Sequence, residues 1–343
     1  MLDAIWDLIR RLNLSNQSDH WNGFWRRFKL HHGFEGRSDE LKMLRLQIEA
    51  LSRRVDQLSD SQVRHDLVRP TYYFLGENRG LTYLSTGQPI FVNTHDCAIT
   101  PWLLMGGHWE TWADEIITSY MRPGMKVIDI GANVGYYSVK WGGVIGPTGE
   151  LHAFEPNPEM TQFIHENFVL NGLSEHCTLH CCALGSTMGV EPLTFTNFNT
   201  GMATLKKTNA PPGVVRIIDV PVRVLDDVLP NIERVDFIKI DVEGYEPNVI
   251  AGARELLQRS PKCAFHVEVQ SFWEDIGGIE ATLAKITAGR CIFVLCHDKT
   301  IRPIALEDVA PYVKNRPGGL VDIFICPPED EYLDRVRAYM QPF

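Results

Sequence analysis

The stretch that decides the fold is Val127-Ile128-Asp129-Ile130-Gly131-Ala132-Asn133-Val134-Gly135-Tyr136, followed by Leu151-His152-Ala153-Phe154-Glu155-Pro156-Asn157. It has the pattern of a β-strand, a glycine loop, a helix and a second strand that ends in an acid. A loop of this kind lets backbone N–H groups approach a ligand closely at the start of a helix. The pattern therefore predicts a site for a nucleotide-like cofactor.

The glycine loop lacks the spacing of a dinucleotide-binding loop. That fingerprint needs glycine at the first, third and sixth positions, where this chain has Gly131, Asn133 and Tyr136. No phosphate-binding lysine follows, which excludes a P-loop. An acid, Asp129, ahead of the loop suits a cofactor that joins adenosine to a cationic amino-acid tail, as S-adenosylmethionine does. Glu155 is placed to accept hydrogen bonds from both ribose hydroxyls.

Composition excludes several classes of protein. The formal net charge of -10 argues against nucleic acid as a partner, because phosphate backbones require basic surfaces. The 8 cysteines form no CxxC pair, so we expect free thiols in a reducing compartment. No run approaches the ~20 apolar residues that span a bilayer, and the start does not resemble a signal peptide. These features predict a cytoplasmic protein.

The first 68 residues predict helices outside the core. Residues 1–36 combine an amphipathic helix with basic and aromatic residues. This segment, chiefly residues 1–34, could contact an anionic membrane surface, or it could dock on its own catalytic domain or on a partner chain. Residues 37–68 carry a heptad pattern of apolar residues, with β-branched residues at two of the a positions and leucine at every d position. That pattern predicts a coiled-coil homodimer through residues 39–63, with an intramolecular helix as the alternative.

The rest of the chain divides into a lead-in segment over 69–124, a core domain over 125–327 and a C-terminal helix or tail over 328–343. The lead-in predicts strands within 71–94 and a helix over 102–120. The core alternates strands with helices, which predicts an α/β, Rossmann-like, mostly parallel seven-stranded sheet covered on both faces. A strand-rich insert spans about 190–224. The seven strand candidates are 127–130, 151–154, 177–184, 237–242, 264–269, 292–295 and 321–326.

Several motifs in this order resemble the FkbM family of class I S-adenosylmethionine-dependent methyltransferases. The motifs are "DIGANVGYYS", "FEPNP", "CCALG", "IKIDVEGYEPNVIAGA" and "FHVEV", within residues 107–269. The resemblance implies O-methylation of sugar hydroxyls, glycan-bearing molecules or natural products, and a sheet whose last strand is antiparallel. It implies that the glycine loop holds the methionine part, that Glu155 binds the ribose and that the turn at 182–184 borders the adenine. The expected cofactor-binding residues are Asp129, Gly131, Ala132, Asn133, Gly135, Glu155, Asn157 and Ala183.

Methyl transfer to a hydroxyl needs a base near the methyl group. Ligands of open α/β sheets bind at the carboxyl ends of the strands, so Asp241 and Glu243 are the expected catalytic residues. Asp241 would position cofactor or substrate, and Glu243 would take the proton, although acids at a helix N-terminus also stabilise that helix. The expected substrate-binding residues are His108, Glu110, Glu268 and Asn199. Carboxylates could also hold a metal, but the sequence has no fixed ligand spacing and we expect none.

The sequence thus predicts an S-adenosylmethionine-dependent O-methyltransferase (EC 2.1.1.-) that acts on a saccharide or saccharide-bearing acceptor. One alternative is an inactive methyltransferase fold within a coiled-coil assembly protein. Another is a methyltransferase that acts on a lipid or another small natural product.

Overall fold

The computed structural model describes residues 72–196, 198–205 and 215–341. The predicted N-terminal segments, 1–36 and 37–68, and the predicted dimer helix at 39–63 lie outside these residues. The domain boundaries at 36, 68, 124 and 327 therefore stay predictions.

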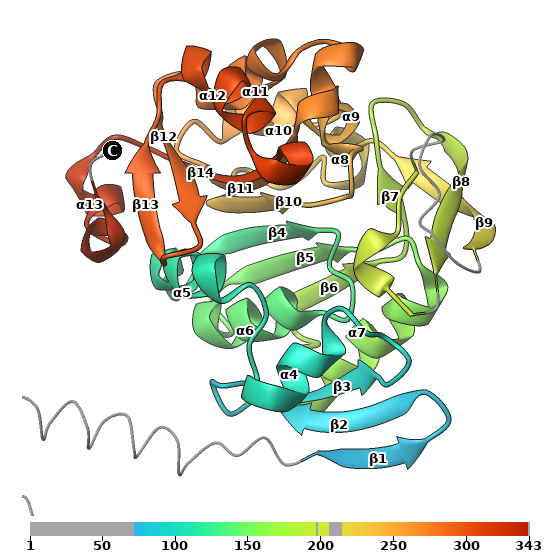
Figure 1. Ribbon diagram of the computed structural model, residues 1–343. Helices are drawn as coiled ribbons and strands as arrows, with labels where there is room; N and C mark the ends of the chain where they lie inside the picture. The colour runs from blue at the N-terminus through green and yellow to red at the C-terminus, as the bar shows by residue number, and fades with distance from the viewer. Residues whose placement is uncertain (1–71, 197, 206–214, 342–343) are drawn as a thin grey trace, which may run out of the picture. The chain divides into compact units, whose positions relative to one another are not determined.

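A sheet of eight strands forms the centre of the described part (Figure 1). Its order is β13-β12-β14-β11-β10-β4-β5-β6, and the run from β11 to β6 is parallel. Strand β14 is antiparallel to β11, as predicted for the last strand, and β13 forms a hairpin with β12 that adds an eighth strand at the edge. The strands are β4 (Lys126–Ile130), β5 (Glu150–Phe154), β6 (Cys177–His180), β10 (Phe237–Ile240), β11 (Ala264–Gln270), β12 (Cys291–Cys296), β13 (Thr300–Pro303) and β14 (Leu320–Cys326).

The sheet separates two hydrophobic cores. In β4, Val127 belongs to the core packed by helices α5, α6 and α7, whereas Ile128 and Ile130 belong to the core packed by helices α8 to α12. Burial on both faces explains why these strands are nearly continuous apolar runs. The predicted α/β fold is therefore confirmed. The helices are α5 (Thr111–Tyr120), α6 (Tyr136–Ile145), α7 (Pro158–Leu170), α8 (Leu225–Val228), α9 (Glu246–Ala251), α10 (Arg254–Arg259), α11 (Ile279–Thr287) and α12 (Leu306–Lys314).

Two predicted helices are each divided into two. The helix predicted over 102–120 consists of α4 (Thr100–Gly106) and α5, because Gly107, at φ 66°, ends the first with a hydrogen bond to the Leu103 carbonyl. The helix that begins near Pro247 ends at Gly252 and resumes as α10. A Cβ at Gly252 would lie 2.1 Å from the Gly185 carbonyl oxygen, so this glycine permits a close approach of two chain segments.

The predicted strand over 177–184 is wrong as a single element. Strand β6 ends at His180, and the chain turns before β7 (Ala183–Leu184), which pairs with β9 (Val215–Arg223) in a separate sheet. That small sheet also contains β8 (Gly189–Thr196) and is the strand-rich insert that the sequence predicts. The turn carries Ala183 to the edge of the cavity described below.

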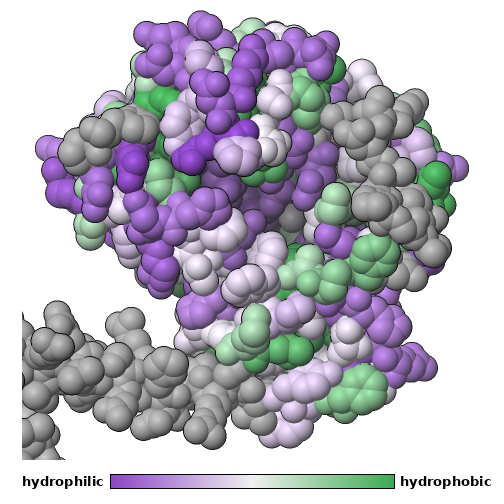
Figure 2. Space-filling model, viewed as in Figure 1, coloured by the Kyte–Doolittle hydropathy of each residue, from purple (hydrophilic) through white to green (hydrophobic). Residues whose placement is uncertain are grey.

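The predicted lead-in strands form a three-stranded antiparallel sheet of β1 (Tyr73–Gly76), β2 (Arg79–Tyr83) and β3 (Pro89–Asn93). Exposed apolar residues gather on β1 and α4, toward the bottom of the face in Figure 2, whereas the top of that face, over α11 and α12, is mainly hydrophilic. None of the helices in the described ranges is both long and apolar enough to cross a membrane. The remaining short elements are η2 (Thr200–Met202), η3 (Ser271–Ile276), η4 (Pro317–Gly319), α13 (Asp330–Leu333) and η5 (Arg337–Tyr339).

Candidate active site

A cavity lies at the carboxyl ends of β4, β5, β10 and β11, where a parallel sheet of this kind binds ligands. Its wall is built from the glycine loop, the segment around Glu110, the turn before β7, the insert and the loop after β10. Nine of the predicted site residues line it: Glu110, Gly131, Ala132, Asn133, Glu155, Ala183, Asp241, Glu243 and Glu268.

The glycine loop is held in a conformation that few residues adopt. Gly131 and Gly135 have φ values of 84° and 85°, and Asn133 has a φ of 52°. Asn tolerates positive φ better than most residues, which is why the bend forms without a third glycine. A Cβ at Gly131 would lie 1.8 Å from the carbonyl oxygen of Asp241. The cofactor loop and the loop after β10 are therefore in direct backbone contact, which only glycine permits.

Glu155 fixes the glycine loop from the end of β5. Its two carboxyl oxygens accept hydrogen bonds from the backbone N–H groups of Asn133 and Asn157, each at 2.9 Å. Burial raises the pKa of Glu155 to about 7 despite these two donors. The side chain faces the cavity at the strand end where an acid binds ribose hydroxyls in nucleotide folds.

Asp241 and Glu243 lie in the loop between β10 and α9. Glu243 has a φ of 54°, a conformation that is strained for a glutamate. The loop is held by buried Glu246, whose Oε1 accepts the N–H groups of Val242 and Gly244 at 3.0 Å. Burial, then the charge of Asp241, raises the pKa of Glu243 to about 8. A carboxyl group with such a pKa is a good proton acceptor near neutral pH.

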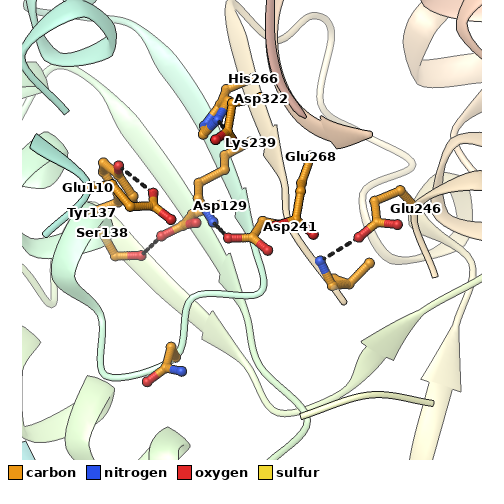
Figure 3. Close-up of polar contacts among 12 residues, drawn as sticks. Glu110, Asp129, Tyr137, Ser138, Lys239, Asp241, Glu246, His266, Glu268 and Asp322 are labelled. Carbon is orange, nitrogen blue, oxygen red and sulfur yellow. Dashed lines mark hydrogen bonds and ion pairs between the residues drawn. The ribbon is translucent and has the colours of Figure 1, made fainter. Parts of the chain in front are cut away.

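Lys239 is a site residue that the sequence analysis does not select. Its Nζ lies 2.8 Å from Oδ2 of Asp241 and 5.4 Å from the centre of the Tyr137 ring, and its side chain is buried (Figure 3). Burial favours the neutral amine, but the charges of Asp241 and Asp129 outweigh it and raise the pKa of Lys239. A lysine inside an otherwise apolar strand, two residues before an acid, is the signal that could have identified it.

Glu110 enters the cavity from the turn between α4 and α5. Its Oε2 accepts a hydrogen bond of 2.9 Å from the Tyr137 hydroxyl, and its φ of 47° is again positive. Burial and the charges of Asp322 and Asp241 raise its pKa to about 8. Glu110, Asn133 and Glu243 are three of the few residues other than glycine with positive φ, and all three line the cavity. Such strain is typical of functional sites.

Glu268 stands at the carboxyl end of β11, where its Oε2 accepts a hydrogen bond of 2.6 Å from Gln270. Oxygen atoms of Asp241, Glu243 and Glu268 lie within 4.8 Å of one another. Carboxylates are ligands for hard divalent cations, so these three side chains are those that could hold one.

His266 is buried on β11, and its Nε2 lies 2.9 Å from Oδ1 of Asp322, but its Nδ1 has no hydrogen-bond partner among the described residues. The other oxygen of Asp322 accepts a hydrogen bond of 3.3 Å from the indole N–H of Trp112 on α5. The contact of Trp112 attaches α5 to β14 of the central sheet.

Five predicted site residues lie outside the cavity lining. Asp129 is fully buried behind the glycine loop, where its Oδ2 accepts a hydrogen bond of 2.5 Å from Ser138. Gly135 and Asn157 precede α6 and α7, and Asn157 caps α7 by accepting the Glu159 N–H. His108 lies 3.8 Å from Asp114, and Asn199 immediately precedes η2. Their predicted roles in binding stay predictions.

Thr200 connects the insert to the cofactor loop. Its hydroxyl lies 3.2 Å from Oδ1 of Asn133 and 3.2 Å from Oδ1 of Asp96. Asp96 is buried and also accepts the backbone N–H groups of Ile99, Thr100 and Thr200. The insert, the start of α4 and the glycine loop therefore share one hydrogen-bond network.

Comparison with known proteins supports the predicted family. Residues 129–293 match the methyltransferase FkbM domain. Methyltransferase sdnD of Sordaria araneosa is 29% identical over 157 residues, which cover 38% of this chain and 60% of that protein. Methyltransferase 1 of Beauveria bassiana is 31% identical over 144 residues, covering 37% of this chain and 57% of that protein. The chain thus spans about three fifths of the length of these curated relatives.

Among solved structures, a SAM-dependent methyltransferase from Aquifex aeolicus is similar at a TM-score of 0.32 and 13% identity, covering 62% of this chain and 87% of that one. The order of the central sheet, its antiparallel β14 and the matched domain agree with the predicted class. Residues 129–293, just under half of the chain, thus match the methyltransferase FkbM domain.

Proposed function

We propose that this protein transfers the methyl group of S-adenosylmethionine to a hydroxyl oxygen of a saccharide or saccharide-bearing acceptor. The observation that supports it most is the position of Glu243, a carboxyl group with a pKa near 8, in the same cavity wall as the glycine loop. The residues present fit the cofactor: Glu155 suits the ribose, and the acids around Lys239 suit a cationic amino-acid tail.

When bound, S-adenosylmethionine supplies an activated methyl group, so the protein mainly has to align the acceptor and remove its proton. The acceptor oxygen forms the new bond to the methyl carbon while the carbon–sulfur bond breaks, and its electron pair stays with sulfur. Glu243 takes the hydroxyl proton as the new bond forms, and Lys239 holds Asp241 beside it. The products are the methyl ether and S-adenosylhomocysteine.

Calorimetry tests the cofactor first. Wild-type protein should bind S-adenosylmethionine and S-adenosylhomocysteine but not NAD. Failure of folded protein to bind either sulfur compound would contradict the proposed activity. Binding without turnover of any acceptor would favour the inactive assembly protein.

Incubation with cofactor labelled in the methyl group, followed by mass spectrometry of glycan, lipid and small-molecule extracts, tests the acceptor. Label in a saccharide supports the proposal, and label confined to lipids or other natural products contradicts its acceptor. Glu243→Gln should lose most turnover and keep cofactor affinity, whereas Glu307→Gln, on the exposed surface of α12, should behave as wild type.

The proposal extends to location and partners. We expect the protein to act in the cytoplasm, as a homodimer through residues 39–63 and without a nucleic-acid partner, with residues 1–34 docking on the catalytic domain or a partner chain or, alternatively, contacting a membrane surface. Analytical ultracentrifugation and vesicle flotation of the full chain, with and without residues 1–68, test the dimer and the membrane contact.

A further inference from the structure

The cavity holds far more acid than base. Five of its described lining side chains carry carboxyl groups, and Lys239 supplies the one ammonium or guanidinium group among those described residues. Glu155 belongs to the predicted ribose end. The other four carboxyl groups are those of Glu110, Asp241, Glu243 and Glu268. Figure 3 shows Lys239 with Glu110, Asp241 and Glu268.

Lys239 does not balance this charge. Its ammonium group is paired with Asp241 at 2.8 Å and also faces Asp129. Asp129 is fully buried, and its Oδ1 has no hydrogen-bond partner among the described residues. S-adenosylmethionine carries a sulfonium, an ammonium and a carboxylate group, so it adds a single net positive charge. Glu110, Glu243 and Glu268 therefore remain in excess.

The excess acids affect one another. The charges of Asp241 and Glu243 contribute, after burial, to a raised pKa of Glu268, and the charge of Asp241 contributes to the raised pKa of Glu243. Like charges that raise one another's pKa values are relieved when a cation binds between them.

Aromatic rings complete the same wall. Trp109, Tyr137 and Tyr245 line the cavity, and Tyr137 already faces the Lys239 ammonium group at 5.4 Å. Aromatic faces attract organic cations through their quadrupole, and acids beside them add charge attraction. Acids and rings together form a wall suited to a protonated amine, because a bound cation stabilises the ionised form of the carboxyl groups, whereas a carboxylate or a phosphate opposes their ionisation.

We propose that the acceptor carries a protonated amine, as an amino sugar does, and that Glu110 and Glu268 select it over neutral and anionic acceptors. This inference rests on the proposed function for its saccharide framework. The two carboxyl groups would select the acceptor by its charge when it binds, and they would take no part in the transfer of the methyl group.

The test uses four methyl glycosides that differ in one substituent: methyl glucoside, methyl glucosaminide, its N-acetyl derivative and methyl glucuronide. The full chain is assayed near neutral pH with labelled S-adenosylmethionine, once with EDTA and once with Mg²⁺. We expect kcat/KM for the amine to exceed that for the neutral glucoside by on the order of tenfold, with the glucuronide lowest. A glucuronide equal to or better than the glucoside, with EDTA or with Mg²⁺, would overturn the inference.

Variants locate the selection. Glu268→Gln and, as a second variant if that one folds poorly, Glu110→Gln should lower the amine-to-glucoside ratio several-fold, whereas Glu307→Gln should leave it unchanged. An unchanged ratio in both cavity variants would also overturn the inference. If no glycoside is methylated, the inference is tested by equilibrium binding of the same four compounds to protein saturated with S-adenosylhomocysteine. Preferential binding of the amine supports the charge selection, and only the proposed methyl transfer is then wrong.

Discussion

Replacement of Gly131 by alanine should separate cofactor binding from folding. Gly131 has a φ of 84°, and an L-residue in the left-handed region costs about 1–2 kcal/mol. The added Cβ would also lie 1.8 Å from the Asp241 carbonyl oxygen, about half the separation of an ordinary van der Waals contact. The glycine loop must therefore move away from the loop after β10. Both loops line the cavity, so the movement should disrupt the cofactor site.

Gly172→Ala is the matched control. Gly172 has a φ of 66°, and a Cβ there would meet no atom within 4 Å. It should show the conformational cost alone, about 1–2 kcal/mol of unfolding free energy, with S-adenosylmethionine affinity within about twofold of wild type. For Gly131→Ala we expect affinity to fall more than about 100-fold, equivalent to about 2.7 kcal/mol of binding free energy.

Isothermal titration calorimetry gives the affinities, and urea denaturation gives the two unfolding free energies. Circular dichroism checks that Gly131→Ala remains folded at the titration temperature. If folded Gly131→Ala binds S-adenosylmethionine within about threefold of wild type, the reasoning from the backbone contact is refuted.

Three further predictions concern buried charges. Asp114 is fully buried and contacts the buried Lys140 at 2.5 Å, so Asp114→Ala should lower the unfolding free energy in urea by about 3–5 kcal/mol. The control Glu115→Ala breaks the exposed pair with Lys299 and should lower it by less than about 1 kcal/mol. Equal losses in the two variants would contradict the argument. The pKa of Glu243 is raised to about 8, and a base must be ionised to accept a proton, so kcat/KM should rise as pH increases through about 8. This rise should vanish in Glu243→Gln. If the variant shows the same pH profile as wild type, Glu243 is not the base. The pKa of Glu155 is raised to about 7, and its carboxylate is expected to accept hydrogen bonds from the ribose hydroxyls. Cofactor affinity should therefore increase as pH rises through about 7. The same pH dependence of affinity in Glu155→Gln would argue against that role.

Local patterns predicted the elements whose neighbours in space are also neighbours in sequence. The glycine loop follows from residue types alone, because Asn133 is one of the few residues that accept positive φ. Strand β10 and its acids also follow, since the carboxyl ends of parallel strands meet at one edge of the sheet.

What the patterns missed depends on contacts between distant parts of the chain. The break between β6 and β7 forms because β7 pairs with β9, about forty residues later, and no local signal gives that pairing. The division of the 102–120 helix was readable at Gly106-Gly107, but the apolar spacing on either side favoured one continuous helix. Lys239 is missed because a lysine is rarely buried without a partner, and its partner Asp241 was predicted to position the cofactor or the substrate.

The buried pair of Lys140 and Asp114 bears on how this chain can be divided. Lys140 lies on α6, inside the matched family domain, but its partner lies on α5, before that domain begins. A chain started at residue 125 would leave the Lys140 ammonium group without its carboxylate and would remove Glu110 from the cavity wall. A fragment or a chimera of this domain therefore has to include the lead-in segment. We expect the smallest transplantable unit of this protein to begin upstream of Glu110, and so before residue 129, where the matched domain begins.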